Sequence, residues 1–323
     1  MIFVLSDKFD KHADVVCEKL EGNKSPFFRL NLDTESLNNT HINFDGSYWS
    51  IFQNNRELNS RKIVSVWVRR PFVEVSLEEE NINDPSFRIW RGEWNKTLLG
   101  LYNSLKSLRW LNPLANAYRA ENKYLQTDVA IKSGFILPDL ITSNRKKDLI
   151  GFVKKHKNVV MKPMNQEFYK DSSDGLFKGL YVNIITEEHL NSFSEHGENP
   201  IVLQAYTDKL YEVRYTVVGN DHHACRIESQ NSEQTKIDWR RYDIPNTPHY
   251  PFDPPKSIKE KVNLLMKEFG LHYGALDFIV SPSGDWYFLE INTMGQWLWI
   301  EDLTGLTISD SIVNFLVKHE EKK

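Results

Sequence analysis

Two apolar segments near the C-terminal end restrict the fold of this chain more than any other feature. Residues 275–280 read Ala-Leu-Asp-Phe-Ile-Val and residues 286–292 read Trp-Tyr-Phe-Leu-Glu-Ile-Asn, with the turn-forming sequence Pro-Ser-Gly-Asp between them. A hairpin that faces water on one side alternates apolar and polar residues, whereas these segments are apolar at nearly every position. The sequence therefore predicts a hairpin covered on both faces, within an α/β (α+β) fold.

The register of this hairpin brings its acidic residues together. A loop of four residues pairs Ser281 with Trp286, and counting back from there places Asp277 opposite Glu290. The period of two adds Asn292 to the face of Glu290. Two carboxylates in a covered sheet repel one another and lose hydration unless a cation lies between them. Three hard oxygen donors favour Mg²⁺, so these three residues are the predicted metal ligands, and acids that only reach solvent are the alternative.

The length and charge of the chain narrow the class of protein. At 323 residues the chain is long for one core, so two or three subdomains are expected. The 40 Lys and Arg residues are balanced by 44 Asp and Glu residues, which argues against a nucleic acid or a membrane as partner. No segment has the roughly 20 apolar residues that span a bilayer, and the two cysteines, Cys17 and Cys225, lie far apart. We therefore expect a cytoplasmic, reducing location.

The first 112 residues predict an N-terminal α/β unit. Residues 2–5 form an apolar strand, and residues 10–20 follow it with helical periodicity. Residues 86–111 place Trp and Leu side chains at helical spacing, which predicts one long amphipathic helix that closes the unit. Asn112 and Pro113 then interrupt the chain, so the boundary is placed at residue 112.

Two further units are expected, over residues 113–200 and 201–323. The predicted elements of the first are a helix at 117–133, a helix at 146–156, a strand at 159–163, a glycine-containing loop at 165–179 and a strand at 181–185. Those of the second, besides the hairpin, are strands at 201–204, 212–218 and 224–228, a proline-rich loop at 245–255, and helices at 258–269 and 308–318.

Two lysines occupy positions at which a positive charge can face a cleft. Lys162 ends a predicted strand just before a proline, and Lys123 lies in the predicted helix 117–133. Either residue alone is most often a solvated surface lysine. The order of polar positions along the chain is more informative: Lys123, Lys162, Gln204-Ala205-Tyr206 at a strand end, Glu212-x-Arg214, Asp277 and Glu290-x-Asn292. This order resembles the ATP-grasp superfamily from about residue 112 onward, and residues 289–292 are its most specific element.

The resemblance implies an ATP-grasp fold in which residues 1–112 are a pre-ATP-grasp domain and the nucleotide lies between the central and C-terminal domains. It implies ATP and Mg²⁺ as cofactors. It further implies nucleotide contacts from Lys123, Lys162, Gln204, Ala205, Tyr206, either Asp208 or Glu212, and the flap glycines Gly175 and Gly179. Arg214 is the implied catalytic residue, which stabilises charge as the γ-phosphoryl group moves to a carboxylate.

Competing nucleotide-binding and hydrolytic classes lack their motifs. The chain contains no G-x-x-x-x-G-K-[ST], no G-x-G-x-x-G and no His-Arg-Asp, which argues against P-loop, dinucleotide-binding and protein-kinase folds. It also lacks H-E-x-x-H, and the adjacent His222 and His223 on a predicted strand face opposite sides. A zinc hydrolase is therefore not indicated.

Two further segments resemble a narrower group. Residues 66–71, and residues 227–230 together with 238–240, resemble the ATP-grasp maturases of ω-ester and ω-amide peptides, the graspetide group that includes the microviridin ligases, and within it the grasp-with-spasm maturases. This resemblance implies that ATP phosphorylates a Glu or Asp side chain of a precursor peptide with leader and core segments. A Ser or Thr hydroxyl, or a Lys amine, of the same peptide then closes the ring. We also expect a homodimer.

Five residues in these segments are the candidates for substrate contact: Arg69, Arg70, Ser229, Asp238 and Arg240. An acyl phosphate and a carboxylate need cations that do not bind ATP, so Arg69 and Arg240 are also catalytic candidates, and Arg240 is favoured. The structural alternatives are an edge strand with solvated arginines, and a helix start that Asp238 caps. A small-molecule ATP-grasp ligase and a catalytically silent nucleotide-binding module are the competing functions.

Overall fold

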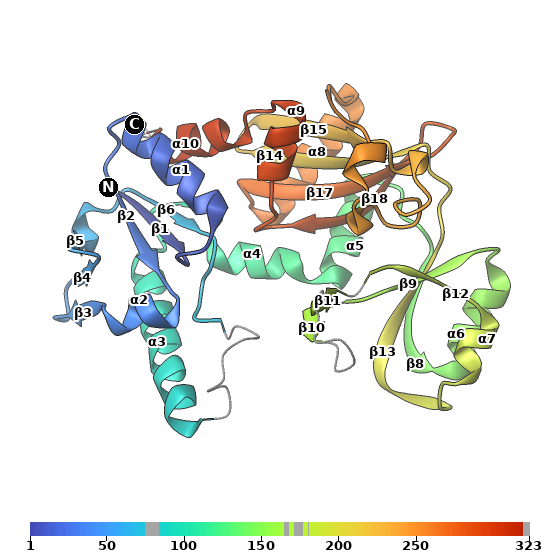
Figure 1. Cartoon of the computed structure of the whole chain (residues 1–323), viewed down its shortest axis with the longest axis horizontal. Coiled ribbons are helices and arrows are strands. Elements are labelled where there is room, and N and C mark those ends of the chain that lie inside the picture. Colours follow the sequence, from blue (N-terminus) through green and yellow to red (C-terminus); the bar gives the residue numbers. More distant parts are fainter. Residues whose placement is uncertain (75–83, 165–167, 171–176, 180, 319–323) are drawn as a thin grey trace.

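The N-terminal unit is built on a parallel sheet with the strand order β2-β1-β6-β7. The structure is a computed structural model, and it describes residues 1–74, 84–164, 168–170, 177–179 and 181–318. Its strands are β1 (Ile2–Ser6), β2 (Phe27–Asn31), β6 (Ser65–Val68) and β7 (Arg109–Leu111). α1 (Lys11–Gly22) follows the buried β1, which confirms the predicted strand and helix. A small antiparallel sheet flanks this unit (Figure 1) and contains β3 (His41–Phe44), β4 (Trp49–Gln53) and β5 (Arg56–Asn59), with the short α2 (Thr34–Asn38) nearby.

The helix predicted over residues 86–111 is too long at its C-terminal end. α3 spans Pro85–Ser104, and its N-cap Asp84 accepts the N–H of Ser86 at 2.9 Å. The residues that follow turn back and form β7, which pairs with β6 in parallel. The pattern failed here because an added strand buries the same apolar residues against the edge of the sheet.

The helix predicted over residues 117–133 is in fact two helices, α4 (Leu114–Glu121) and α5 (Lys123–Lys132). Asn122 separates them. Its side-chain oxygen accepts the N–H groups of Tyr124 at 3.1 Å and Leu125 at 3.0 Å, as the N-cap of α5. The break places Lys123 at the first turn of α5, where its side chain reaches the C-terminal hairpin.

The central unit is an antiparallel sheet with the strand order β12-β9-β13-β8. Its elements are β8 (Leu140–Arg145), α6 (Lys146–Lys155), β9 (Val159–Lys162), the hairpin β10 (Phe168–Lys170) and β11 (Phe177–Gly179), β12 (Asn183–Ile185), α7 (Glu187–Asn191) and β13 (His196–Ala205). α6 and α7 cover the sheet (Figure 1). A cluster of buried apolar residues, which includes Leu149 and Leu203, is drawn entirely from residues 141–205. The central unit therefore has a core of its own.

The largest sheet is antiparallel, with the strand order β16-β15-β14-β17-β18. Its strands are β14 (Tyr211–Val218), β15 (Asp221–Ile227), β16 (His249–Phe252), β17 (Tyr273–Val280) and β18 (Trp286–Asn292). α5 and α8 (Lys256–Phe269) cover one face of it, and α9 (Leu298–Thr304) and α10 (Ile308–Val317) cover the other. Both faces of the sheet are therefore buried, as the apolar hairpin predicted.

Residues 249–252 correct one expectation, because the prolines predicted a loop over residues 245–255. These residues form β16 at the edge of the largest sheet, where Pro251 pairs with Cys225. An edge strand tolerates proline because one side of the strand makes no ladder hydrogen bonds. His222 and His223 on β15 do face opposite sides: His222 Nδ1 lies 2.8 Å from the Tyr215 hydroxyl, and His223 Nε2 lies 2.9 Å from the Ser311 hydroxyl.

The hairpin of β17 and β18 places Asp277 opposite Glu290, which confirms the predicted register by a different route. Val280 pairs with Trp286, so the loop is one residue longer than expected. A bulge next to Asp277 adds one residue to β18 and cancels that difference.

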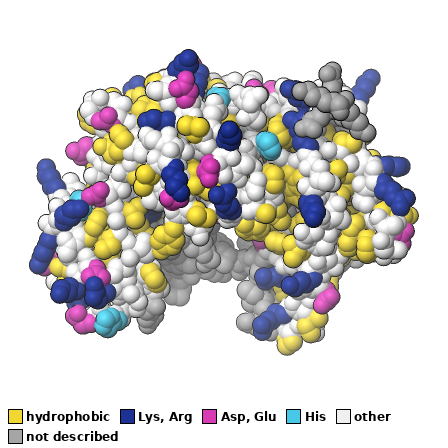
Figure 2. Space-filling view, turned by 180° about the vertical axis from the view of Figure 1, so that it is seen from behind, with side chains coloured by type: hydrophobic (Ala, Val, Ile, Leu, Met, Phe, Trp, Pro, Cys, Tyr) yellow, Lys and Arg dark blue, Asp and Glu magenta, His cyan; other side chains and the backbone are white. Residues whose placement is uncertain are grey.

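The N-terminal and C-terminal units share one hydrophobic core. Ile2, Val4 and Trp67 of the N-terminal sheet belong to the same buried cluster as Tyr273 and Trp297. None of the described helices is long and apolar enough to cross a membrane. Charged side chains of both signs are interspersed over the face in Figure 2, whose lower margin is hollowed between two lobes.

Candidate active site

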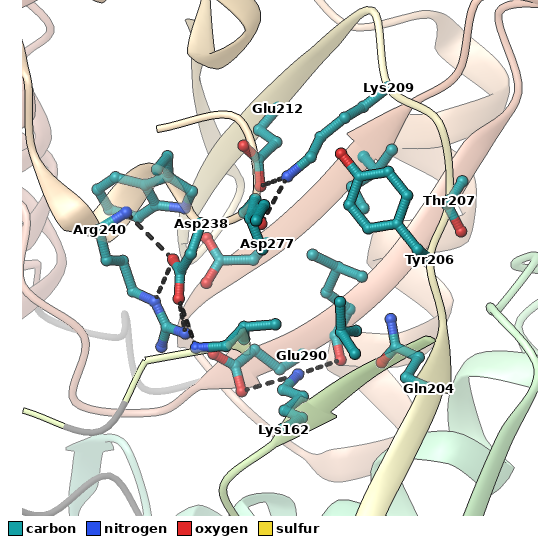
Figure 3. Close-up of a pocket in the computed structure, with 16 residues that line it drawn as sticks. Lys162, Gln204, Tyr206, Thr207, Lys209, Glu212, Asp238, Arg240, Asp277 and Glu290 are labelled. Atoms are coloured by element: carbon teal, nitrogen blue, oxygen red, sulfur yellow. Dashed lines mark hydrogen bonds and ion pairs between the residues drawn. The ribbon is translucent and has the colours of Figure 1, made fainter. Parts of the chain in front are cut away.

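A cleft of about 600 Å³ lies between the central sheet and the C-terminal sheet. Its walls come from β9 and β13 on one side, from β14, β17 and β18 on the other, and from the loop around residue 238. The polar residues that line it are Lys162, Gln204, Tyr206, Thr207, Lys209, Glu212, Asp238, Arg240, Asp277 and Glu290 (Figure 3).

The paired carboxylates of the hairpin lie buried in this cleft beside three cations. Glu290 Oε2 lies 2.7 Å from Lys123 Nζ and 3.5 Å from Lys162 Nζ. Asp277 accepts two hydrogen bonds from Arg214 Nη1, at 3.0 and 2.9 Å. Five of the sequence-predicted residues, from four separate segments, are therefore in direct contact.

Burial and the neighbouring cations shift the pKa values of the two acids in opposite directions. Burial raises the pKa of Asp277, and Arg214 offsets only part of that rise. Burial also acts to raise the pKa of Glu290, but Lys162 and Lys123 outweigh it and hold this pKa well below its usual range. Glu290 is therefore a fixed negative charge at neutral pH.

The donor set of the hairpin fits Mg²⁺. Asp277 and Glu290 face one another, and Asn292 lies two residues beyond Glu290 on the same face of β18. In the described part of the chain, no group of three His, Cys, Asp or Glu side chains is placed to hold a metal ion by itself. Mg²⁺ needs only one or two protein carboxylates when phosphate oxygens and water complete its octahedron. Two carboxylates and an amide meet that requirement.

Glu212 lies in the cleft beside the segment that leaves β13. It is 4% exposed, and its Oε1 lies 3.0 Å from Lys209 Nζ. Burial raises the pKa of Glu212, and Lys209 opposes that rise. The Ser229 hydroxyl lies near the Glu212 carboxylate and acts to lower its pKa, and Glu212 Oε2 is buried without a hydrogen-bond partner of good geometry among the described residues. A buried acceptor of this kind is normally satisfied, so it is suited to a hydroxyl of a bound molecule.

Asp238 and Arg240 form the remaining charged pair of the cleft (Figure 3). Arg240 Nε and Nη2 donate to the two carboxylate oxygens of Asp238 at 2.8 and 2.7 Å. Burial acts to raise the pKa of Asp238, but Arg240 outweighs it and the pKa is lowered. Asp238 also accepts the Arg240 N–H as the cap of a short turn in which Trp239 is buried. Asp238 therefore caps this turn, as the structural alternative predicted, and also lies in the cleft.

Comparisons with known proteins agree with this architecture. The model of the MvdD pre-ATP-grasp domain matches residues 1–118. A RiPP-associated ATP-grasp ligase from Chryseobacterium gregarium, solved with ADP and a leader and core peptide, is 28% identical with a TM-score of 0.85, over 98% of this chain and 96% of that chain. The macrocyclases MdnC and MdnB from Microcystis aeruginosa are 25% and 27% identical, with TM-scores of 0.83 and 0.76, over 98% of this chain and 99% of theirs. No curated protein sequence matches the chain.

The chain is an ATP-dependent ligase with the ATP-grasp fold. The structural matches span nearly its whole length, which includes the N-terminal unit and the two units that form the cleft. The predicted fold class is therefore confirmed, including the pre-ATP-grasp domain at the N-terminus.

Lys209 and Thr207 are the polar residues of the ligase cleft that sequence reasoning missed, and Lys209 is the charged one. The side chain of Lys209 is 2% exposed, and its Nζ also donates to the carbonyl of Ile237 at 3.0 Å. The available signal was a lysine three residues before Glu212, directly after the polar pair Thr207-Asp208. Asp208, the alternative to Glu212, is exposed and is not among the residues that line the cleft, and Ala205 packs against the central core.

Arg69 and Arg70 of the ligase do not line the cleft that contains Arg240. Arg69 lines a separate cavity of about 190 Å³, where its Nη1 donates to the Met294 carbonyl at 2.6 Å and its Nε lies 3.2 Å from Asp10. Arg70 pairs with Asp7 at 3.1 Å and with Glu74.

The remaining predicted residues are Ser229, Gly175 and Gly179. Ser229 is buried in a short turn, where its hydroxyl accepts a hydrogen bond from Gln230 at 3.1 Å. Gly179 ends β11, and Gly175 lies outside the described residues.

Proposed function

We propose that this ligase is a peptide macrocyclase. It phosphorylates a Glu or Asp side chain of a ribosomal precursor peptide with ATP. A Ser or Thr hydroxyl, or a Lys amine, of the same peptide then displaces the phosphate, and an ω-ester or ω-amide ring forms. The observation that carries the proposal is the position of Arg240 in the same cleft as Lys162 and Glu290. The close similarity to ligases solved with precursor peptides supports it.

We assign the two ends of the cleft to the two ends of the nucleotide. Lys123 and Lys162 provide positive charge for phosphate oxygens, and Glu290 holds both ammonium groups in place. Gln204 and Tyr206 line the part of the cleft assigned to the base, and Glu212 Oε2 accepts a ribose hydroxyl there. The acids and the amide of the hairpin would hold Mg²⁺, which would neutralise part of the phosphate charge.

Two arginines have donors left for the reacting groups. The fork between Arg240 and Asp238 uses Nε and Nη2, so three of the five guanidinium N–H groups remain for a substrate carboxylate or an acyl phosphate. Arg214 contacts Asp277 through Nη1 alone, and its Nε is buried without a hydrogen-bond partner among the described residues. We propose that Arg214 stabilises the phosphoryl group in transfer and that Arg240 holds the acid side chain.

The proposal extends to the organisation of the protein. We place the domains at residues 1–112, 113–200 and 201–323, with β13 crossing the second boundary into the central sheet. A homodimer in the cytoplasm is part of the same proposal.

Mass spectrometry of a candidate precursor tests the function. The precursor is incubated with the ligase, ATP and Mg²⁺, with free amino acids present as competing substrates. Loss of one water for each ring, only with ATP present, is the expected result. A gain in mass from an added amino acid would show instead a ligase that acts on small molecules or on chain ends.

A further inference from the structure

The loop that carries Arg240 also grips the central unit of the ligase. Asp238 Oδ2 accepts the backbone N–H of Val182 at 3.2 Å. Arg241 Nη2 donates to the carbonyl of Val182 at 2.8 Å and to Asn183 Oδ1 at 2.7 Å. Two side chains from one loop therefore hold both backbone groups of Val182, the residue just before β12.

This grip joins two bodies that have separate cores. The core of the central unit comes from residues 141–205, whereas the loop belongs to the C-terminal unit through the buried Trp239. Lys162 crosses the cleft elsewhere, with its Nζ 3.4 Å from the Leu289 carbonyl. Polar contacts of this kind break and form with little net change in free energy, so they permit the central unit to move relative to the C-terminal unit.

The loop itself is held in a strained conformation beside the grip. Tyr242 has a φ of 45°, in the region that residues other than glycine rarely adopt. Gln234 fixes the strained turn, because its side-chain amide donates to the carbonyls of Arg241 at 2.6 Å and Tyr242 at 2.9 Å. Strain of this kind persists where surrounding contacts over-determine the backbone, and it concentrates at functional sites.

The carboxylate of Asp238 connects the grip to the substrate end of the cleft. It receives the N–H of Val182 and the guanidinium fork of Arg240 at the same time. A shift of Val182 away from the loop removes one donor from Asp238 and changes the support of Arg240. Arg241 contacts Val182 from the other side and so sets whether this shift occurs.

We propose that Arg241 is a positioning residue that couples closure of the central unit over the nucleotide to the placement of Arg240 at the substrate end. Its link runs through Val182 and Asp238. The inference rests on the proposed function for the nature of the substrate, and only on nucleotide binding for the coupling itself. Since coupling between two sites is reciprocal, a bound nucleotide tightens binding of the precursor, and the precursor tightens binding of the nucleotide.

The first experiment measures precursor affinity with and without ADP and Mg²⁺. In the wild-type ligase we expect the nucleotide to tighten precursor binding by about fivefold or more. In Arg241→Ala this factor falls to nearly one, while the affinity without nucleotide stays within about twofold of wild type. Arg241→Lys, which keeps one donor for Val182, restores part of the factor. A purely structural role would weaken both affinities alike and leave their ratio unchanged, which would overturn the proposal.

Two further variants test whether a folding defect, and not the lost contact, explains the result for Arg241→Ala. Asn183→Ala removes one acceptor from an exposed residue and leaves the Val182 carbonyl, so an intermediate coupling factor is expected. Arg145→Ala is the matched control, because this exposed arginine of the central unit forms an ion pair with Asp148, at 2.6 Å. Its coupling factor should equal that of wild type, and a loss there would contradict a specific role for Arg241.

Hydrogen exchange with nucleotide alone separates this proposal from the proposed function. ADP and Mg²⁺ should protect the amides of residues 237–243 in wild type and in Arg145→Ala, but not in Arg241→Ala. Protection of residues 160–162 should persist in all three proteins. Equal protection of 237–243 in Arg241→Ala, or none in wild type, would refute the coupling. If wild type shows the protection and cyclises no precursor, the coupling stands and the proposed function fails.

Discussion

Glu290→Gln tests the electrostatic design of the cleft. Removing one partner of a buried ion pair costs about 3–5 kcal/mol when the other charge stays buried. The side chains of Lys123 and Lys162 are still 26% and 18% exposed, so water can solvate their ammonium groups in the variant. A glutamine oxygen can also accept a hydrogen bond from Lys123. We therefore expect the free energy of unfolding to fall by about 2 kcal/mol at pH 7.

The stability difference between wild type and Glu290→Gln should also depend on pH, in a direction set by the pKa of Glu290. The pKa of Glu290 in the folded protein lies below its ordinary value of 4.5. Its ionised form therefore stabilises the protein above pH 4.5, and this contribution is lost as the pH falls through the folded pKa. The difference in stability between wild type and Glu290→Gln should accordingly be smaller by roughly 1 kcal/mol at pH 4 than at pH 7.

Urea unfolding followed by tryptophan fluorescence measures both quantities. Glu268→Gln is the matched control, because Glu268 is 58% exposed and lies 3.8 Å from Arg119, so its loss should change stability by less than about 0.5 kcal/mol. A variant as stable as wild type at pH 7, or a difference that does not change with pH, would refute the reasoning. Turnover provides a second readout, since loss of a metal ligand should lower kcat at least about tenfold.

Two other substitutions separate substrate contacts from nucleotide contacts. Arg240→Ala should leave precursor affinity within a few-fold of wild type but lower the rate of cyclisation about 100-fold. Arg240→Lys should restore only part of that rate, because lysine lacks the planar guanidinium fork. An equal loss of affinity and rate would argue against contact with the reacting acid. Glu212→Gln should raise the KM for ATP about tenfold with little change in kcat, because it weakens a contact made before and during reaction. A fall in kcat at unchanged KM would place Glu212 outside the ribose site.

The hairpin shows why some of the site could be predicted from sequence. Its two strands are apolar at nearly every position, so Asp277 and Glu290 stood out as charges that needed a partner. The pairing was correct although the loop length was wrong, because the longer loop and the bulge shift the register by opposite amounts. A bulge leaves no clear sequence signal, since it depends on the packing of neighbouring strands.

Other features depended on contacts between distant segments. The end of α3 could not be found from its own periodicity, because residues 109–111 pair with β6, which in turn pairs with β1 from the start of the chain. These distant pairings stabilise a strand over residues 109–111 in place of a longer helix. Lys209 becomes a site residue only when Ile237 and Glu212 approach it in the fold. The positive charge of Arg69 suits a substrate contact, yet its side chain binds the Met294 carbonyl and does not reach the cleft. Local patterns carry no information on such distances.

The nucleotide product, measured against ring formation in one reaction, tests the central claim most directly. The wild-type ligase is incubated with the precursor, ATP and Mg²⁺. The nucleotides are then separated and quantified by chromatography, and the mass of the peptide is measured by mass spectrometry. Activation of a carboxylate as an acyl phosphate predicts one ADP and one phosphate for each water lost from the peptide. AMP as the stoichiometric product, or ring formation without consumption of ATP, would contradict the account.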